Sequence, residues 1–262
     1  MTQKRITVQK LLNFNVIMAG LHGVQALLVW ILSDPDRGNW TVSGNYLTLD
    51  PASSAESPAL QVATQDLFTV NLAYIVVAFF LMSAVAHLFV ATLYRNRYEA
   101  DLKRGMNKVR WFEYSLSAST MMVGIALLSG IYDLSSLILI FGLTAIMNLM
   151  GLTMEIYNQK RESPNWLAFW IGTLAGILPW VVIGVYFWTG NTYGTGQIPT
   201  FVYFIYVSIF LFFNSFAINM LLQYKKIGKW KNYLYGEKAY IILSLLAKTV
   251  LAWQVFAGSL RP

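Results

Sequence analysis

Residues 241–253 read IILSLLAKTVLAW, an apolar run with a single lysine, Lys248, near its centre. The apolar run extends over roughly 238–259, and a helix needs about 20 mostly apolar residues to cross a bilayer. A charged side chain at the middle of such a span is costly, so it marks a functional site by default. The stretch therefore indicates a membrane protein whose function depends on a buried lysine.

The composition of the whole chain also indicates a membrane protein. Of its 262 residues, 56% are hydrophobic and 12% are charged, and the mean hydropathy is +0.52. Because soluble domains carry about 25% charged residues, the surplus apolar side chains here must face something other than water. The chain has no cysteine, which excludes disulfides, thiolate metal sites and cysteine nucleophiles.

Seven apolar runs are long enough to span a bilayer. They lie at roughly 11–32, 67–93, 109–131, 135–157, 165–188, 199–223 and 238–259. These runs lack the alternation of apolar and polar residues that the strands of a transmembrane barrel require. We expect an all-α, seven-transmembrane helix bundle that forms one domain over residues 1–262.

The distribution of lysine and arginine predicts the orientation of the bundle. Sixteen of the nineteen cations lie on the N-terminus and on the loops after the second, fourth and sixth runs. They are Lys4, Arg5, Lys10, Arg95, Arg97, Lys103, Arg104, Lys108, Arg110, Lys160, Arg161, Lys225, Lys226, Lys229, Lys231 and Lys238. The other side has only Arg37 and Arg261, so we expect a multi-pass protein of the cell membrane with a cytoplasmic N-terminus and an extracellular C-terminus. This topology and contact with anionic membrane lipid account for the net charge of +7, so nucleic acid is not an expected partner.

The only long connection, residues 33–66, falls on the predicted extracellular side. Its acidic residues are Asp34, Asp36, Asp50, Glu56 and Asp66. Residues 40–49 have the composition of a strand, with a turn signal at Gly44 and Asn45. We expect a β-hairpin there, and a disordered loop is the alternative.

One carboxylate lies within an apolar run, where it can balance the buried lysine. Burial favours the neutral amine of Lys248, which is a nucleophile toward a carbonyl, so a Schiff base with an aldehyde is open to this residue. Glu113 lies in the segment RWFEYSLS at 110–117, whereas the other eleven acids fall in loops or at helix ends. The alternative to a reactive site is a structural ion pair that joins two helices.

Polar residues share helix faces with these two charges, since residues four apart lie on the same side of a helix. The pairs with this spacing are Glu113 and Ser117, Ser244 and Lys248, and Ser83 and His87. His22 and His87, the only histidines, both lie within spans, where a hydrogen-bonded contact between helices is more common than a proton carrier. No paired spacing such as HExxH is present, so we expect no metal site.

Several segments resemble signatures of the heliorhodopsins, a family of microbial-type, retinal-binding rhodopsins with inverted membrane topology. The segments are NFN at 13–15, RWFEYSLS at 110–117, GILPW at 176–180, LFFNSFA at 211–217, and residues 239–254, which include SLLAK at 244–248 and AWQ at 252–254. The resemblance covers nearly the whole chain. It also agrees with the cytoplasmic N-terminus that the charges predict.

The resemblance implies that Lys248 carries all-trans retinal as a protonated Schiff base and that Glu113 is its counterion. It implies a polar cavity on the cytoplasmic side of the Schiff base, surrounded by Ser83, Ser117, Ser244, His22, His87 and Asn107. It also implies that the retinal is contacted by Tyr114, Met121, Thr144, Met147, Trp170, Pro179, Phe212 and Phe213. Thr144 departs from the asparagine of many relatives, which leaves the tuning of the colour open.

The resemblance further implies a homodimer that uses residues 33–66 and the helices. We expect a photosensory protein with a slow photocycle, not an enzyme. Its cytoplasmic loops at 95–110 and 225–238 are the candidate surface for a signalling protein, and ordinary solvated loops of the positive-inside pattern are the favoured alternative. An ordinary outward proton pump has an acid four residues before the lysine and a second acid three turns beyond Glu113. Ser244 and Gly124 stand at these positions. A light-driven or light-gated ion transporter with the same chromophore, and a protein that uses Lys248 and Glu113 without retinal, are the alternatives.

Overall fold

The computed structural model describes residues 6–54, 57–196 and 198–262. Within them the chain forms eight α-helices, one antiparallel pair of strands and two short helical turns. The elements are α1 (Val8–Leu32), β1 (Asn39–Leu49), β2 (Leu60–Asn71), α2 (Leu72–Ala91), α3 (Arg95–Lys103), α4 (Lys108–Leu128), α5 (Leu134–Asn158), α6 (Leu167–Tyr193), α7 (Thr200–Tyr224), η1 (Gly228–Lys231), α8 (Tyr233–Val255) and η2 (Phe256–Leu260). Lys4, Arg5 and Glu56, which entered the charge analysis, lie outside the described residues.

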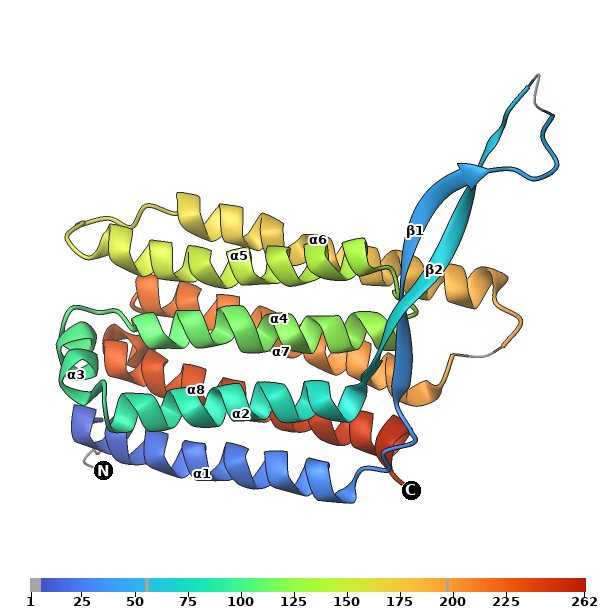
Figure 1. Ribbon diagram of the computed structural model, residues 1–262. Coiled ribbons are helices and arrows are strands. Elements are labelled where there is room, and N and C mark those ends of the chain that lie inside the picture. Colours follow the sequence, from blue (N-terminus) through green and yellow to red (C-terminus); the bar gives the residue numbers. More distant parts are fainter. Residues whose placement is uncertain (1–5, 55–56, 197) are drawn as a thin grey trace.

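Seven long helices lie side by side in a bundle (Figure 1). The short helix α3, the N-terminus and the α5–α6 and α7–α8 connections lie at one end, which we call the α3 end. The β1–β2 hairpin and the C-terminus lie at the opposite end, the hairpin end. Helix α4 contacts α2, α5 and α7, so its side chains are surrounded by other helices.

Six of the long helices are long and apolar enough to cross a membrane. They are α1, α2, α5, α6, α7 and the continuous segment Tyr233–Leu260. Helix α4 has 21 residues but is less apolar, because its first turns carry Lys108, Arg110 and Glu113. The fold is thus a membrane helical bundle in which the most polar long helix occupies an interior position.

The expected hairpin is present, but the predicted turn was wrong. Gly44 and Asn45 lie within β1, which runs unbroken and pairs with β2 from Asn39↔Asn71 to Leu49↔Leu60. A turn at Gly44 would leave two very short strands, whereas the observed ladder satisfies the backbone of two long ones. The second helix therefore begins at Leu72 and not at 67, and the long connection extends to Asn71.

The hairpin is joined to the bundle at its base. The Ser43 N–H donates a hydrogen bond to the Tyr132 carbonyl oxygen at 2.9 Å. The ring of Trp40 stacks on that of Tyr132, with the ring centroids 5.4 Å apart. Tyr132 belongs to the tight connection between α4 and α5, where the sequence predicts a break. Asp133 is the N-cap of α5, because its side chain accepts a hydrogen bond from the Ser136 N–H at 2.9 Å.

Two helical segments differ from the expectation in ways that affect the site. Helix α3 was not predicted, and it covers the α3 end with Tyr98 and Leu102 buried against α1. Helix α8 begins at Tyr233 and not at 238, since Asn232 caps it by accepting the Leu234 N–H at 3.0 Å. The remaining expected helices begin and end within five residues of α1, α4, α5, α6 and α7.

Candidate functional site

Lys248 and Glu113 meet inside the bundle, as their positions within apolar runs predict. Lys248 Nζ from α8 lies 3.4 Å from Glu113 Oε1 of α4, and only 3% of the lysine is exposed. Ser244, one turn earlier on α8, accepts a hydrogen bond from Nζ at 2.8 Å. Ser83 of α2 donates a hydrogen bond to Glu113 Oε1 at 2.6 Å. Three helices thus contribute to one buried, hydrogen-bonded ion pair.

The two histidines lie next to this ion pair. The rings of His22 and His87 stack, with centroids 5.5 Å apart and planes 8° apart. His87 Nδ1 lies 2.6 Å from Asn15 Oδ1, which is the contact between helices that a buried histidine favours. Neither ring nitrogen of His22 and no atom of the buried Ser117 hydroxyl has a hydrogen-bond partner among the described residues. Buried polar atoms without partners among the described residues therefore lie on Ser117, one turn from Glu113, and on His22, beside His87.

A small cavity of about 30 Å³ extends from Glu113 toward the α3 end. Of the six residues that the resemblance implies for a polar cavity, His87 and Asn107 line it. Ser83 and Ser244 instead bond to the two charged groups, and His22 and Ser117 are fully buried beside them. Asn107 caps α4 by accepting the Arg110 N–H at 3.1 Å, which fixes the far wall of the cavity.

A second buried charge cluster closes that wall, and the sequence analysis missed it. The Arg110 guanidinium forms ion pairs with Glu155 of α5 and Glu237 of α8, and all three side chains are buried. Trp111 Nε1 and the Asn107 N–H donate to Glu155 Oε2 at 2.7 and 2.9 Å. The loop position expected for Arg110 was wrong, because α4 begins at Lys108 and carries Arg110 into the bundle. Glu155 and Glu237 lie near helix ends, as expected, but their burial was not expected.

An apolar cavity begins on the other side of the lysine. Its inner part, of about 50 Å³, is lined by Lys248, Ser244, Ala247, Tyr114, Ala118, Met121, Met147, Asn148, Phe213 and Phe216. Four of these, Met147, Asn148, Phe213 and Phe216, also line an outer part of about 160 Å³ between α5, α6 and α7. The two parts therefore adjoin at this shared wall, and together they extend from Lys248 to the side of the bundle.

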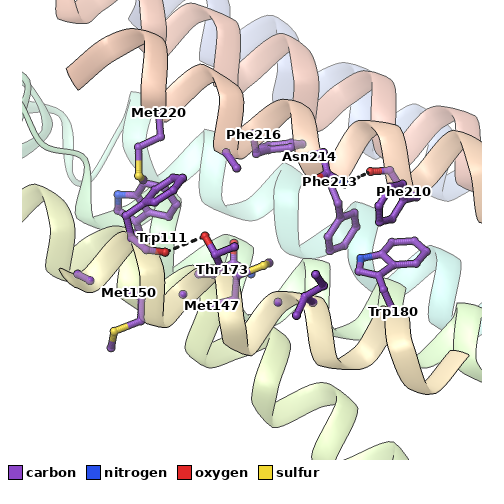
Figure 2. Close-up of a pocket in the computed structure, with 18 residues that line it drawn as sticks. Trp111, Met147, Met150, Thr173, Trp180, Phe210, Phe213, Asn214, Phe216 and Met220 are labelled. Carbon is purple, nitrogen blue, oxygen red and sulfur yellow. Dashed lines mark hydrogen bonds between the residues drawn. The ribbon is translucent and has the colours of Figure 1, made fainter. Parts of the chain in front are cut away.

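Figure 2 shows the outer part of this cavity. Trp180, Phe210 and Phe213 gather at one end, and Trp111 and Met220 lie at the other. The polar groups on its wall are turned to their own helices: Thr173 Oγ1 donates to the Phe169 carbonyl oxygen and Asn214 Nδ2 donates to that of Phe210 (Figure 2). The cavity is thus suited to a long apolar ligand.

Four of the eight residues that the resemblance implies beside the ligand line the cavity. They are Tyr114, Met121, Met147 and Phe213. Thr144 is buried one turn before Asn148 and bonds to the Ile140 carbonyl oxygen. Pro179 is buried in α6 and Phe212 packs against the apolar core, neither on the cavity wall.

Trp170 was placed wrongly. It is 64% exposed on the outer surface of α6 and does not line the cavity. Its position in an apolar helix did not reveal which side of the helix faces the bundle. Asn148, which lines both parts of the cavity, was missed for the same reason.

A protein-family model matches nearly the whole chain. This model, described as Heliorhodopsin, matches residues 11–260. The matched range includes Lys248, Glu113, the Arg110 cluster and every residue named on the cavity wall. No curated protein matches the chain.

Replacing Arg110 by Gln should destabilise the protein by about 3–5 kcal/mol, because Glu155 and Glu237 would be left buried without a counter-charge. The measurement is equilibrium unfolding in detergent. Arg95→Gln is the matched control, since Arg95 pairs with Glu99 at the surface, and the loss there should be at most about 1 kcal/mol. Equal losses for the two variants would contradict a structural role for the cluster.

Proposed function

This chain belongs to the heliorhodopsin family of retinal-binding, light-sensing rhodopsins, and from this premise we propose how its residues hold the chromophore. Lys248 binds all-trans retinal covalently as a protonated Schiff base, and Glu113 is the counterion. The observation that carries this proposal is the lysine amine, which lies at the inner end of an apolar cavity and 3.4 Å from a buried carboxylate. The family is one of photoreceptors and not of typical enzymes.

When bound, retinal supplies absorption of visible light and a light-driven isomerisation. The chain's own residues control the charge on the Lys248 nitrogen. The Glu113 carboxylate stabilises positive charge there, and the interaction is strong because both groups are removed from water. Ser83 fixes the carboxylate by donating a hydrogen bond, and Ser244 accepts one from the lysine nitrogen.

The apolar cavity would hold the hydrocarbon chain of the ligand. Tyr114, Met121, Met147 and Phe213 are the proposed contacts, because they line the space that begins at Lys248. The polar Asn148 is a further contact on this wall. Gly176 keeps the cavity open next to Met147, since a Cβ atom there would lie 2.3 Å from Met147 Sδ.

We propose a sensory output and a slow photocycle. What supports a sensor is that the buried charged side chains among the described residues lie at the ion pair itself and toward the α3 end. Toward the α3 end the buried polar groups continue from Glu113 through His87 and Asn15 to Arg110. Toward the hairpin end the helices pack through a fully apolar cluster that includes Val76, Phe79, Phe80, Met122, Ile125, Leu127, Leu251 and Val255. Carrying an ion across the bundle requires polar groups along the whole path, and this cluster interrupts it.

Light-driven or light-gated ion transport is the second candidate function. The polar groups between Glu113 and the Arg110 cluster favour it, since they could exchange a proton with the α3 end. A light-induced current in a voltage-clamped membrane would support transport, and its absence would support the sensor.

The proposed topology has seven spans, with α4 as the third, and an N-terminus in the cytoplasm. It rests on the charges: exposed lysines and arginines gather at the α3 end, whereas the hairpin end has only Arg37 and Arg261. The hairpin would then lie outside the cell, where it is the proposed surface for a homodimer. Apolar side chains exposed on it include Tyr46, Leu47, Leu49, Leu60 and Val62, and such patches mark interaction sites. An unidentified signalling protein on the cytoplasmic loops is a further proposed partner.

Lys248→Ala should abolish the visible absorption band of the protein expressed with all-trans retinal, because no other buried amine faces the apolar cavity among the described residues. Absorption spectra before and after hydroxylamine in the light measure the linkage. Lys238→Ala, on the same helix but exposed, is the control and should keep the band. A band retained by the Lys248 variant would refute the attachment site.

Glu113→Gln should move the absorption maximum to longer wavelength, because the carboxylate stabilises the positive nitrogen more in the ground state than in the excited state. The visible spectrum of the purified variant measures the shift. Glu99→Gln, which changes a half-buried acid on α3 that pairs with Arg95, should leave the maximum unchanged. An unshifted spectrum for the Glu113 variant would point to a different counterion.

The topology can be tested by labelling, because the natural chain has no cysteine. Ala52→Cys, at the tip of the hairpin, should react with a membrane-impermeant maleimide on intact cells. Lys103→Cys, at the end of α3, should react only after the cells are opened. The reverse pattern would place the N-terminus outside.

A further inference from the structure

A groove lies between the α3-end portions of α7 and α8, away from the ligand cavity. Its volume is about 360 Å³. Ile218 and Leu222 of α7 and Ile242 and Leu243 of α8 form its walls. Both helices are apolar enough to span a membrane, so the groove opens where lipid chains surround the bundle.

The mouth of the groove is formed by a well-connected turn. Lys226 and Gly228 have φ of 51° and 53°, and this left-handed turn folds η1 back onto α7. Trp230 Nε1 donates to Asn219 Oδ1 at 2.6 Å, and the Trp230 ring meets that of Tyr235 edge-on at 4.9 Å. Tryptophan and tyrosine with one apolar and one polar end favour the headgroup level of a membrane.

Five lysines without carboxylate partners lie on the connection between α7 and α8 and at the start of α8, the segment that forms this mouth. They are Lys225, Lys226, Lys229, Lys231 and Lys238, all exposed, and none forms an ion pair with the described residues. Lys238 lines the groove, and Lys229 Nζ lies 5.9 Å from the Tyr235 ring on the groove wall. On the α3 side of the same end, by contrast, Arg95, Arg104 and Lys108 are paired with Glu99 and Asp101. The positive charge at the groove is therefore not neutralised by the protein.

We propose that this groove binds one anionic phospholipid from the leaflet at the α3 end. An acyl chain lies against Ile218, Leu222, Ile242 and Leu243, and the phosphate lies between Lys229 and Lys238. A soluble acidic peptide would match the lysines but not apolar walls that lie among lipid chains. A lipid with a neutral headgroup would match the walls but leave the lysines unneutralised. Only a ligand with an apolar tail and an anionic head matches both.

The test is native mass spectrometry of the full chain in detergent with equal amounts of phosphatidylglycerol and phosphatidylcholine. The wild-type protein should retain one phosphatidylglycerol in preference to phosphatidylcholine. The double variant Lys229→Gln/Lys238→Gln should lose about 25-fold in this preference, because each lysine beside an anionic headgroup contributes about fivefold. Lys103→Gln/Lys160→Gln removes two exposed lysines at the same end but away from the groove, and it should retain the wild-type preference.

A second variant separates a groove from general attraction of anionic lipid to lysines. Ala239→Trp fills the groove, whose wall includes Ala239, and leaves all five lysines in place. It should lose the bound phosphatidylglycerol while its circular dichroism and elution volume match those of the wild type. Retention of the lipid by this variant, or equal losses in the two lysine double variants, would overturn the proposal.

Discussion

A lysine in the middle of a helix bundle is the constraint on which the rest of this structure depends. Moving an ammonium group out of water costs several kcal/mol unless an opposite charge and hydrogen bonds replace the water. Here Glu113, Ser83 and Ser244 provide that replacement. Because they come from α4, α2 and α8, these contacts fix how far the three helices are shifted along their axes and which side of each helix faces the others. The apolar cavity on the opposite side of Lys248 then follows from the same arrangement, since α8 keeps its lysine between the two environments.

The ion pair lies between two halves of the bundle that differ in the polarity of their buried side chains. The α3 end contains a second set of buried charges, in which the three groups Arg110, Glu155 and Glu237 carry an excess of one carboxylate. The hairpin end contains tightly packed apolar side chains. Charges interact more strongly in the apolar half than in the polar half, because polar groups reduce the field between them. A change of charge at Lys248 is therefore compensated mainly by the polar and charged groups at the α3 end.

Features that depend on how deep a residue lies in a span could be predicted from the sequence. Features that depend on which side of a helix faces the bundle, or on a partner distant in sequence, could not. Lys248 lies in the middle of an apolar run and Glu113 is the one acid expected inside another, so their pairing could be expected. Arg110 and Glu237 lie near helix ends, where a charge can equally reach water, and only the pairing of Arg110 with Glu237 and with Glu155 of α5 reveals their burial. Trp170 lies in an apolar helix whose outward side cannot be read from composition. The turn predicted at Gly44 did not form, because β1 continues through this residue and pairs with β2.

The hydrogen bond between Ser43 and Tyr132 has a consequence for the order of events during synthesis. Its two residues belong to β1 and to the connection between α4 and α5. The ribosome completes β1 long before that connection emerges, so the hairpin can form its own ladder early but must wait for α4 and α5 before it is fixed to the bundle. Until then the hairpin that joins the first two helices lacks this contact with the bundle, and the later helices arrive beside it.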